Sequence, residues 1–392
     1  MEDNLYHFAP LECFAADEQK DTTEAVQLSQ AAVQAVEFFG LQIEKAEYID
    51  TPQLVRVDFA LDFVSSGKAA SFCKKIENQL NIFLQRNGCR CFVNNGLTVE
   101  LPKAQRHTVR MRQFLLAQYK NMQLPAVLGI DSNGEQLVID LATAPHLLIA
   151  GQTGSGKSVC LNDILSAMLE MKQPADVNFV LIDPKTVELS AYAGIPHLAV
   201  PIATSPIEAL QLLQWVVQEM QNRYAYLSRI GARSIEQANG AFPRLVVAID
   251  ELASLMQTSK KEVEILISRI AAEGRAAGIH LIVCTQHPSA KIITGAIKAN
   301  IPTRIAFKAA SNSDSRVILD TVGAEKLTGK GDGLFVTPND TSVRRFQACY
   351  ISPQEVDAVV YYAKSNIRRK KSGNRFFSKI FKRNAKRVHA QT

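Results

Sequence analysis

The residues with the clearest chemical capacity form a glycine-rich segment, Gly151–Ser158, which has the pattern G-x-x-x-x-G-K-S. The apolar stretch His146–Ala150 precedes this segment, and a helical pattern follows it. In that context the spacing is typical of a phosphate-binding loop, whose backbone N–H groups surround a β-phosphate at a helix N-terminus. Lys157 is expected to reach the β- and γ-phosphate oxygens of ATP, and the Ser158 hydroxyl is expected to ligate Mg²⁺. The expected nucleotide-binding residues are Gly151, Gln152, Thr153, Gly154, Ser155, Gly156, Lys157, Ser158 and Val159.

Acidic residues opposite such a loop would complete a magnesium nucleotide site, and Asp250 and Glu251 directly follow the apolar stretch Leu245–Ile249. We expect Asp250 to hold Mg²⁺ through water and Glu251 to act as the general base on the attacking water. Two acids after a strand can also do no more than cap the next helix. Gln286 ends a further apolar stretch, where it either senses the γ-phosphate as part of the catalytic set or is an ordinary polar residue at a strand end.

Other reactive side chains give weaker signals. Asp183 ends the stretch Val177–Ile182, and its carboxylate either orients the magnesium site or caps a turn. Cys89 and Cys91 are separated by one residue and have no nearby histidine, a spacing that disfavours zinc.

The elements that must position these residues are short apolar stretches that alternate with helical patterns after residue 123. The expected strands are His146–Ala150, Val177–Ile182, Leu245–Ile249, Leu281–Cys284 and Arg304–Phe307, and the expected helices are Val159–Met171, Pro206–Ile230 and Lys261–Ala277. Strands that are apolar throughout suit a parallel sheet buried on both faces, so the alternation predicts a doubly wound α/β core.

The region before residue 123 has a different pattern. Helical patterns over Thr22–Phe39 and Ala69–Leu84, with alternating stretches at Leu54–Phe63 and Cys89–Leu101, predict a small α+β domain. We therefore expect a flexible leader at 1–23, the small α+β domain at 24–122, an ATPase domain at 123–366 and a basic tail at 367–392.

Composition limits the class of protein. The 392 residues are 47% hydrophobic and 21% charged, which excludes a purely disordered or fibrous protein. The absence of an apolar run of roughly 20 residues, the acidic Glu2 and Asp3, and the lack of a disulfide-like cysteine pattern favour a cytoplasmic protein.

The net charge of +6 arises from the end of the chain. Residues 365–392 contain ten basic and no acidic residues, which leaves 34 basic against 38 acidic residues before them. Such a tail favours nucleic acid, the anionic surface of the inner membrane or a partner protein, unless it is merely solvated. Four apolar residues alternate with its lysines and arginines at helical spacing, which is compatible with a basic amphipathic helix on lipid: Phe376, Phe377, Ile380 and Phe381.

Several longer motifs resemble the FtsK/SpoIIIE family of DNA translocases. They are His146–Ser158, Leu181–Lys185 with Glu188 and Leu189, Gly194–His197, Arg275–His280, Thr285–Gln286 with Pro288 and Ser289, and Ile297–Phe307. The resemblance covers residues 123–364 and, more weakly, 22–122, which is similar to the family's α domain. It implies a RecA-like P-loop NTPase motor core with a smaller N-terminal α+β domain.

The resemblance also implies a homo-oligomeric ring, usually a hexamer, that hydrolyses ATP between neighbouring subunits and threads double-stranded DNA through its channel. Arg275 matches the arginine finger that enters the adjacent subunit's site, although a charge complementing a helix C-terminus would also explain it. DNA contact is expected from the segment 288–315, since phosphate contacts ignore base sequence. Its candidates are Lys298, Lys291 and Lys308, whereas His287 and Asn312 stand where the family usually or often has a basic residue.

Cell-division members of the family also carry a membrane domain and a winged helix, for which this sequence offers no segment. We therefore expect a stand-alone motor for DNA transfer, segregation or mobile-element maintenance. Two alternatives stay open: a protein-secretion or DNA-packaging ATPase of the same superfamily, and a nucleotide-dependent scaffold that has lost hydrolysis.

Overall fold

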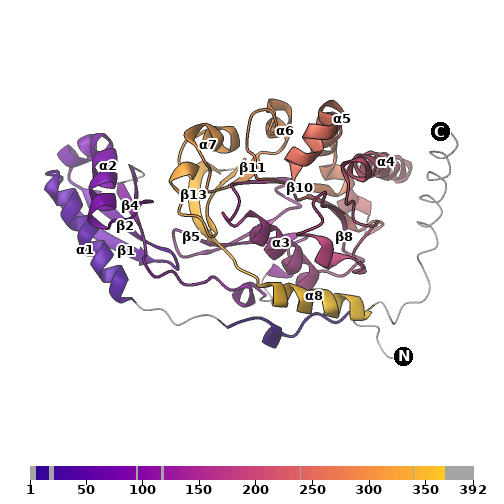
Figure 1. Ribbon diagram of the computed structural model, residues 1–392, viewed down its shortest axis with the longest axis horizontal. Coiled ribbons are helices and arrows are strands. Elements are labelled where there is room, and N and C mark those ends of the chain that lie inside the picture. Colours follow the sequence, from indigo (N-terminus) through magenta and orange to yellow (C-terminus); the bar gives the residue numbers. More distant parts are fainter. Residues whose placement is uncertain are drawn as a thin grey trace.

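The computed structural model describes residues 6–16, 22–93, 96–115, 119–238, 240–338 and 340–366. The expected basic tail and part of the expected leader lie outside these ranges. The described chain forms a smaller unit and a larger unit side by side, with α8 (Pro353–Ser365) beneath the larger one (Figure 1). Within the described ranges, no helix combines the length and the hydrophobicity that crossing a membrane requires.

The smaller unit is an antiparallel sheet with two helices packed on it. Its strands are β1 (Ile43–Asp50), β2 (Leu54–Leu61), β3 (Arg90–Val93) and β4 (Leu97–Pro102), in the order β1-β2-β4-β3, and its helices are α1 (Thr23–Phe38) and α2 (Phe63–Phe83). Helix α2 begins six residues before the predicted start because Asp62 caps it, accepting a 2.8 Å hydrogen bond from the Ser65 N–H.

The larger unit contains a nine-stranded sheet. Its strands are β5 (Pro125–Asp131), β6 (Gln136–Asp140), β7 (His146–Ala150), β8 (Val177–Ile182), β9 (Arg244–Ile249), β10 (Ile279–Thr285), β11 (Thr303–Phe307), β12 (Asp332–Thr337) and β13 (Asp340–Ala348), in the order β6-β5-β13-β12-β11-β7-β10-β9-β8. The five strands predicted from the sequence are the parallel ones, β11-β7-β10-β9-β8. The other four strands, for which the sequence made no prediction, pair antiparallel and extend the sheet toward the smaller unit.

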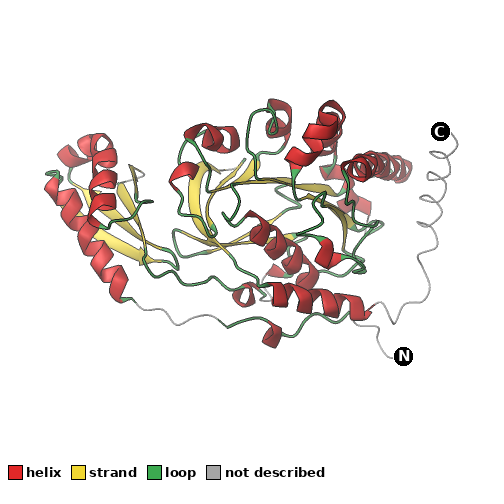
Figure 2. Ribbon diagram, in the orientation of Figure 1, coloured by secondary structure: helices red, strands yellow, loops and turns green. Residues whose placement is uncertain are grey.

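Helices cover both faces of this sheet (Figures 1 and 2). One face carries α3 (Lys157–Met171) and α8, and the other carries α4 (Pro206–Ile230) and α5 (Leu252–Glu273), with α6 (Gly295–Asn300) and α7 (Asn312–Leu319) nearby. Two separate apolar cores fill the two layers. The predicted helix Lys261–Ala277 is wrong at both ends. Helix α5 starts at Leu252 and bends at Ser259, where φ is −145° and ψ is 56°, and it ends at Glu273, before the 3-10 helix Arg275–Ala277.

A buried ion pair joins the two units. Arg345 of β13 donates from Nε and Nη2 to the carboxylate of Asp332 on β12, at 2.9 and 2.8 Å, and from Nη1 to the carbonyl of Gly88 in the smaller unit, at 2.9 Å. Gln53 of the smaller unit also donates to Asp332, at 3.2 Å. Burial works to raise the pKa of Asp332, but the Arg345 charge together with the hydrogen bonds from Arg345 and Thr328 outweighs it and holds the pKa below its usual range. The pair therefore stays charged and fixes the smaller unit against β12.

We expect Arg345→Ala to destabilise the protein strongly, because it leaves the Asp332 charge buried without its cation. Breaking such a pair costs about 3–5 kcal/mol. The matched control is Arg269→Ala, whose side chain is 41% exposed and pairs with Glu273, which is 49% exposed, so its loss should cost less than about 1 kcal/mol. Urea unfolding of both variants measures the difference, and equal losses would contradict this account of how the two units are joined.

Candidate nucleotide-binding site

The glycine-rich loop lies between β7 and α3, where the sequence places it. Gly154 and Gly156 have φ of 76° and 117°, a region that favours glycine. A Cβ on Gly156 would lie 2.8 Å from the backbone of Gly331, whose N–H donates to the Ser155 carbonyl at 2.8 Å. A second loop, residues 328–331, therefore packs directly on the phosphate-binding loop.

Lys157 contacts the carboxylate that the sequence analysis assigns to magnesium. Its Nζ lies 2.7 Å from Asp250 Oδ1 and 2.8 Å from the Asp250 carbonyl oxygen, and both side chains are almost fully buried. Burial works to lower the pKa of Lys157, but nearby negative groups, Asp250 among them, outweigh it and raise the pKa above its ordinary value. A phosphate bound at this loop therefore has to compete with Asp250 for a fully charged ammonium group.

Glu251 is held rigidly beside this pair. Its carboxylate accepts hydrogen bonds from the Thr285 hydroxyl at 2.8 Å and from the Gln286 N–H at 3.2 Å, and it caps α5 through the Ala253 N–H at 3.3 Å. The Lys185 ammonium lies 3.5 Å away. The Glu251 side chain, which is only 2% exposed, therefore both caps α5 and lies next to Asp250.

Gln286 touches the phosphate-binding loop directly, because the Thr153 hydroxyl donates to Gln286 Oε1 at 2.8 Å. The structure therefore brings together Lys157, Asp250, Glu251 and Gln286, which lie beyond the carboxyl ends of three neighbouring parallel strands, β7, β9 and β10. Their roles in catalysis stay predictions.

A cavity of about 1130 Å³ opens over the loop. Besides residues 152–159 and Gln286, its lining comes from segments 104–110, 328–331 and 347–350 and from Glu188. These segments could not be predicted from the sequence, since they lie far apart in the chain and carry no nucleotide-binding motif. Among the described residues, the cavity is lined by the cationic side chains of Arg106, Arg110, Lys157 and Lys330 and by one carboxylate, that of Glu188. This charge balance suits a polyanion such as a nucleoside triphosphate.

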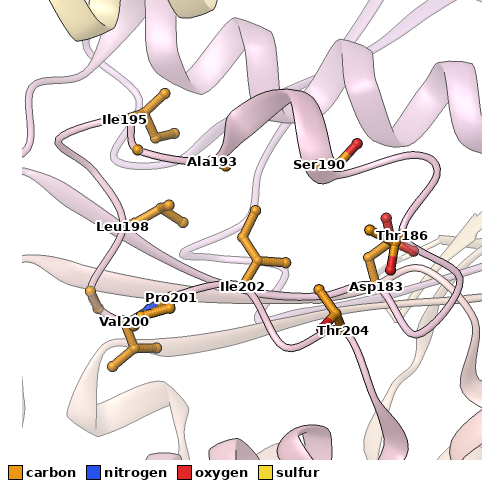
Figure 3. A pocket seen from close by; sticks show the side chains of 12 residues that line it. Asp183, Thr186, Ser190, Ala193, Ile195, Leu198, Val200, Pro201, Ile202 and Thr204 are labelled. Atoms are coloured by element: carbon orange, nitrogen blue, oxygen red, sulfur yellow. The ribbon is translucent and has the colours of Figure 1, made fainter.

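Asp183 belongs to a loop anchor. Its carboxylate accepts backbone N–H groups from Lys185, Glu188 and Leu189, at 3.2, 3.0 and 2.9 Å. Of the two alternatives, the turn-capping one describes these contacts. On its other side lies a separate, mostly apolar cavity of about 510 Å³ (Figure 3), whose lining includes Ile195, Leu198 and Ile202 but no residue of the phosphate-binding loop.

Arg275 lies at the opposite edge of the sheet. It follows α5 in a short 3-10 helix, Arg275–Ala277, that precedes β10, whereas Gln286 follows the other end of that strand. Strand β10 has seven residues, which separates its ends by roughly 20 Å. The Arg275 side chain is exposed and forms no hydrogen bond or ion pair with any residue that the structure describes.

The three candidate DNA-binding lysines have different surroundings. Lys298 Nζ lies 2.6 Å from Asp320, which also pairs with Arg304, so this cluster holds two cations and one anion. Lys308 adjoins the phosphate-binding loop, because its carbonyl accepts the Gln152 N–H at 2.9 Å. Lys291 is exposed before α6. DNA contact by these residues stays a prediction.

The chain matches a known family and several named relatives. The model of the FtsK/SpoIIIE family matches residues 110–245 and 237–290. DNA translocase FtsK of Treponema pallidum is 45% identical over 69% of this chain, and DNA translocase SftA of Bacillus subtilis is 46% identical over 70%. DNA translocase FtsK of Clostridium acetobutylicum is 36% identical over 93% of this chain. The matched segments cover 36%, 30% and 50% of these relatives, so the chain spans at most half of their length.

Solved structures with the same fold are P-loop ATPases. The conjugation coupling protein TcpA of pCW3, determined with ATPγS, matches over 88% of this chain and 100% of its own, with a TM-score of 0.58 and 24% identity. The cytoplasmic domain of the type VII secretion ATPase EccC of Thermomonospora curvata matches over 62% of this chain and 31% of its own, with a TM-score of 0.55 and 26% identity. The expected α/β, RecA-like P-loop fold is confirmed by these likenesses.

We expect Glu251→Gln to bind nucleotide and to hydrolyse it poorly, because an amide keeps the contact with Thr285 but cannot accept the proton of water. Loss of a general base lowers rates by about 10²–10⁴-fold. Single-turnover hydrolysis and ATPγS binding measure the two properties separately. The control Glu262→Gln, on the exposed side of α5, should change neither, and wild-type turnover in Glu251→Gln would remove this residue from the catalytic set.

Proposed function

The chain belongs to the FtsK/SpoIIIE family, and from this premise we propose that it is an ATPase that moves along double-stranded DNA. The observation that carries the proposal is the arrangement at one edge of the sheet. There the phosphate-binding loop and Gln286 line a cationic cavity, and Lys157 of that loop contacts Asp250, which directly precedes Glu251. The named relatives are DNA translocases, which favours DNA as the polymer.

The chemistry we propose is hydrolysis of ATP with Mg²⁺. Ser158 and Asp250 would hold the metal ion, since a hydroxyl and a carboxylate are the hard oxygen ligands that Mg²⁺ takes in P-loop sites. Lys157 would leave Asp250 for the phosphates, which frees that carboxylate for the metal. Glu251, fixed by Thr285 and the Gln286 N–H, would accept the proton of the attacking water.

We propose that neighbouring copies complete each site, in a ring that we expect to be a hexamer. Support comes from Arg275, which lies too far from its own chain's phosphate-binding loop to reach a nucleotide there, yet is exposed and free of partners among the described residues. In a head-to-tail assembly it would supply positive charge to the γ-phosphate of the adjacent copy.

DNA contacts through Lys291, Lys298 and Lys308 belong to the same proposal. Lys291 is the most open of the three, while Lys298 would have to share its charge with Asp320. The basic tail, 367–392, is proposed to hold DNA, the anionic surface of the inner membrane or a partner protein, in the cytoplasm.

A second function, secretion of protein, is favoured by the likeness to the secretion ATPase EccC. The two functions differ in the polymer that accelerates hydrolysis. A DNA motor is stimulated by duplex of any sequence, because phosphate contacts carry no base information. A secretion motor is stimulated by a protein substrate.

We expect linear duplex DNA to stimulate ATP hydrolysis at low salt and the protein to displace a triplex-forming oligonucleotide from that duplex. Lys157→Ala is the negative control, since it removes the ammonium group from the phosphate-binding loop. Hydrolysis that is independent of DNA at every protein concentration tested, with no triplex displacement, would exclude the DNA motor.

We expect Arg275→Ala to bind ATPγS normally and to hydrolyse ATP about 10³-fold more slowly, the lower end of the effect of an arginine finger. Titrating it into wild-type protein should depress activity more steeply than dilution does, because each variant copy disables its neighbour's site. Arg269→Ala removes an exposed arginine from α5, the helix that precedes Arg275, where it pairs with Glu273, and should only dilute activity. A proportional decline with Arg275→Ala would argue against shared sites.

A further inference from the structure

The loop that packs on the phosphate-binding loop ends in a cationic side chain of its own. Residues 328–331 read Thr-Gly-Lys-Gly, and Lys330 lies at the tip with φ of 53°, between Gly329 and Gly331 with φ of 83° and 88°. A non-glycine residue in this region is uncommon and costs conformational energy, so the surroundings must impose it. Gly329 and Gly331 adopt their positive φ angles without strain, so the strain in this turn is confined to Lys330.

Hydrogen bonds fix the backbone on either side of Lys330. The Gly331 N–H donates to the Ser155 carbonyl at 2.8 Å, the Gly331 carbonyl accepts the Ala348 N–H at 2.7 Å, and the Lys330 carbonyl accepts Gln347 Nε2 at 3.0 Å. The side chain of Lys330 is not fixed in this way. Lys330 is exposed, and its ammonium group forms no hydrogen bond or ion pair with any described residue.

The Lys330 side chain lies at the cavity above the phosphate-binding loop. Lys330 lines the same 1130 Å³ cavity as Gly154, Gly156 and Lys157. Gly331, the next residue, contacts both Ser155 and Gly156. The flexible four-carbon side chain of Lys330 therefore starts within a few ångströms of the loop that would surround the phosphates. Lys157 is engaged with Asp250, whereas Lys330 is available.

We propose that Lys330 is a second cationic ligand of the bound nucleotide and contacts its phosphate oxygens from the side opposite α3. This inference rests on the proposed ATP site and extends it to a loop without a recognised nucleotide motif. A bound triphosphate then lies between two lysines, one from each of two loops that are bonded to each other.

The same loop connects the cavity to the smaller unit. Thr328 donates its N–H and its hydroxyl to Asp332 at 2.8 and 2.7 Å, and Asp332 is the partner of Arg345. A Cβ on Gly88 of the smaller unit would lie 2.9 Å from the Thr328 side chain. The ion pair that joins the two units therefore also sets the position of Lys330 over the nucleotide.

The test is nucleotide affinity in the full chain. Lys330→Met keeps most of the stem and removes the charge, and we expect it to weaken ATPγS binding about tenfold, the effect of losing one charge-assisted contact. The binding constant should also become less dependent on salt. Lys330→Arg should restore affinity, and Lys260→Met, which removes an exposed charge from α5, should leave it unchanged.

Several results would overturn the inference. Unchanged ATPγS affinity in Lys330→Met would do so, as would equal losses in the Met and Arg variants or a lower melting temperature of Lys330→Met without nucleotide, which would indicate a structural role. A loss of DNA affinity with normal ATPγS affinity would place the lysine on DNA instead. Wild-type protein that binds ATPγS but moves no DNA would refute the proposed function alone, whereas wild-type protein that binds no ATPγS would refute both.

Discussion

The register of three parallel strands determines the site. Thr285 of β10 pairs with Ala150 of β7, and Val283 of β10 pairs with Ile249 at the end of β9. The residues that follow these strands, Gly151, Asp250 and Gln286, therefore emerge at the same edge of the sheet. Because both faces of the strands are buried, a slip of one residue would move apolar side chains from one core to the other as well as separating the polar ones. The packing of the sheet thus specifies the chemistry at its edge.

The four antiparallel strands have a different role. Residues such as Gly151, Asp250 and Gln286 follow the parallel strands and not these four. The antiparallel strands instead carry Asp332 and Arg345, and the loop before β12 packs on Ser155. Arg345 has one hydrogen bond into the smaller unit and two to Asp332. A displacement of the smaller unit that strains this pair would be felt at the phosphate-binding loop, because few groups lie between them and nearly all are buried and hydrogen-bonded.

Sequence alone predicts the parallel half of this structure well and the remainder poorly. Strands such as Val177–Ile182 are apolar at every position, and helix α4 begins with Pro206 after the capping Ser205 and ends before Gly231, so local signals define their limits. Strand β1 has mostly exposed residues and no alternation, which leaves no signal to detect. The start of α5 was missed because its bend at Ser259 interrupts the helical period. At the site, the motif predicts Lys157, but Lys330 and the segment 104–110 reach the cavity only through tertiary packing.

Strand β10 connects the residue that contacts this chain's phosphate-binding loop with the arginine proposed to enter the neighbouring copy's site. Its carboxyl end leads into Gln286, which touches both the phosphate-binding loop and Glu251, and its amino end is preceded by the turn that holds Arg275. All seven of its residues are buried between β7 and β9, so the strand moves with the sheet as one body and not as a flexible segment. The strand therefore fixes the position of Gln286 relative to Arg275 within one chain. In a ring of proposed shared sites, the residue that touches one phosphate-binding loop would thus be held rigidly against the arginine that enters the next site.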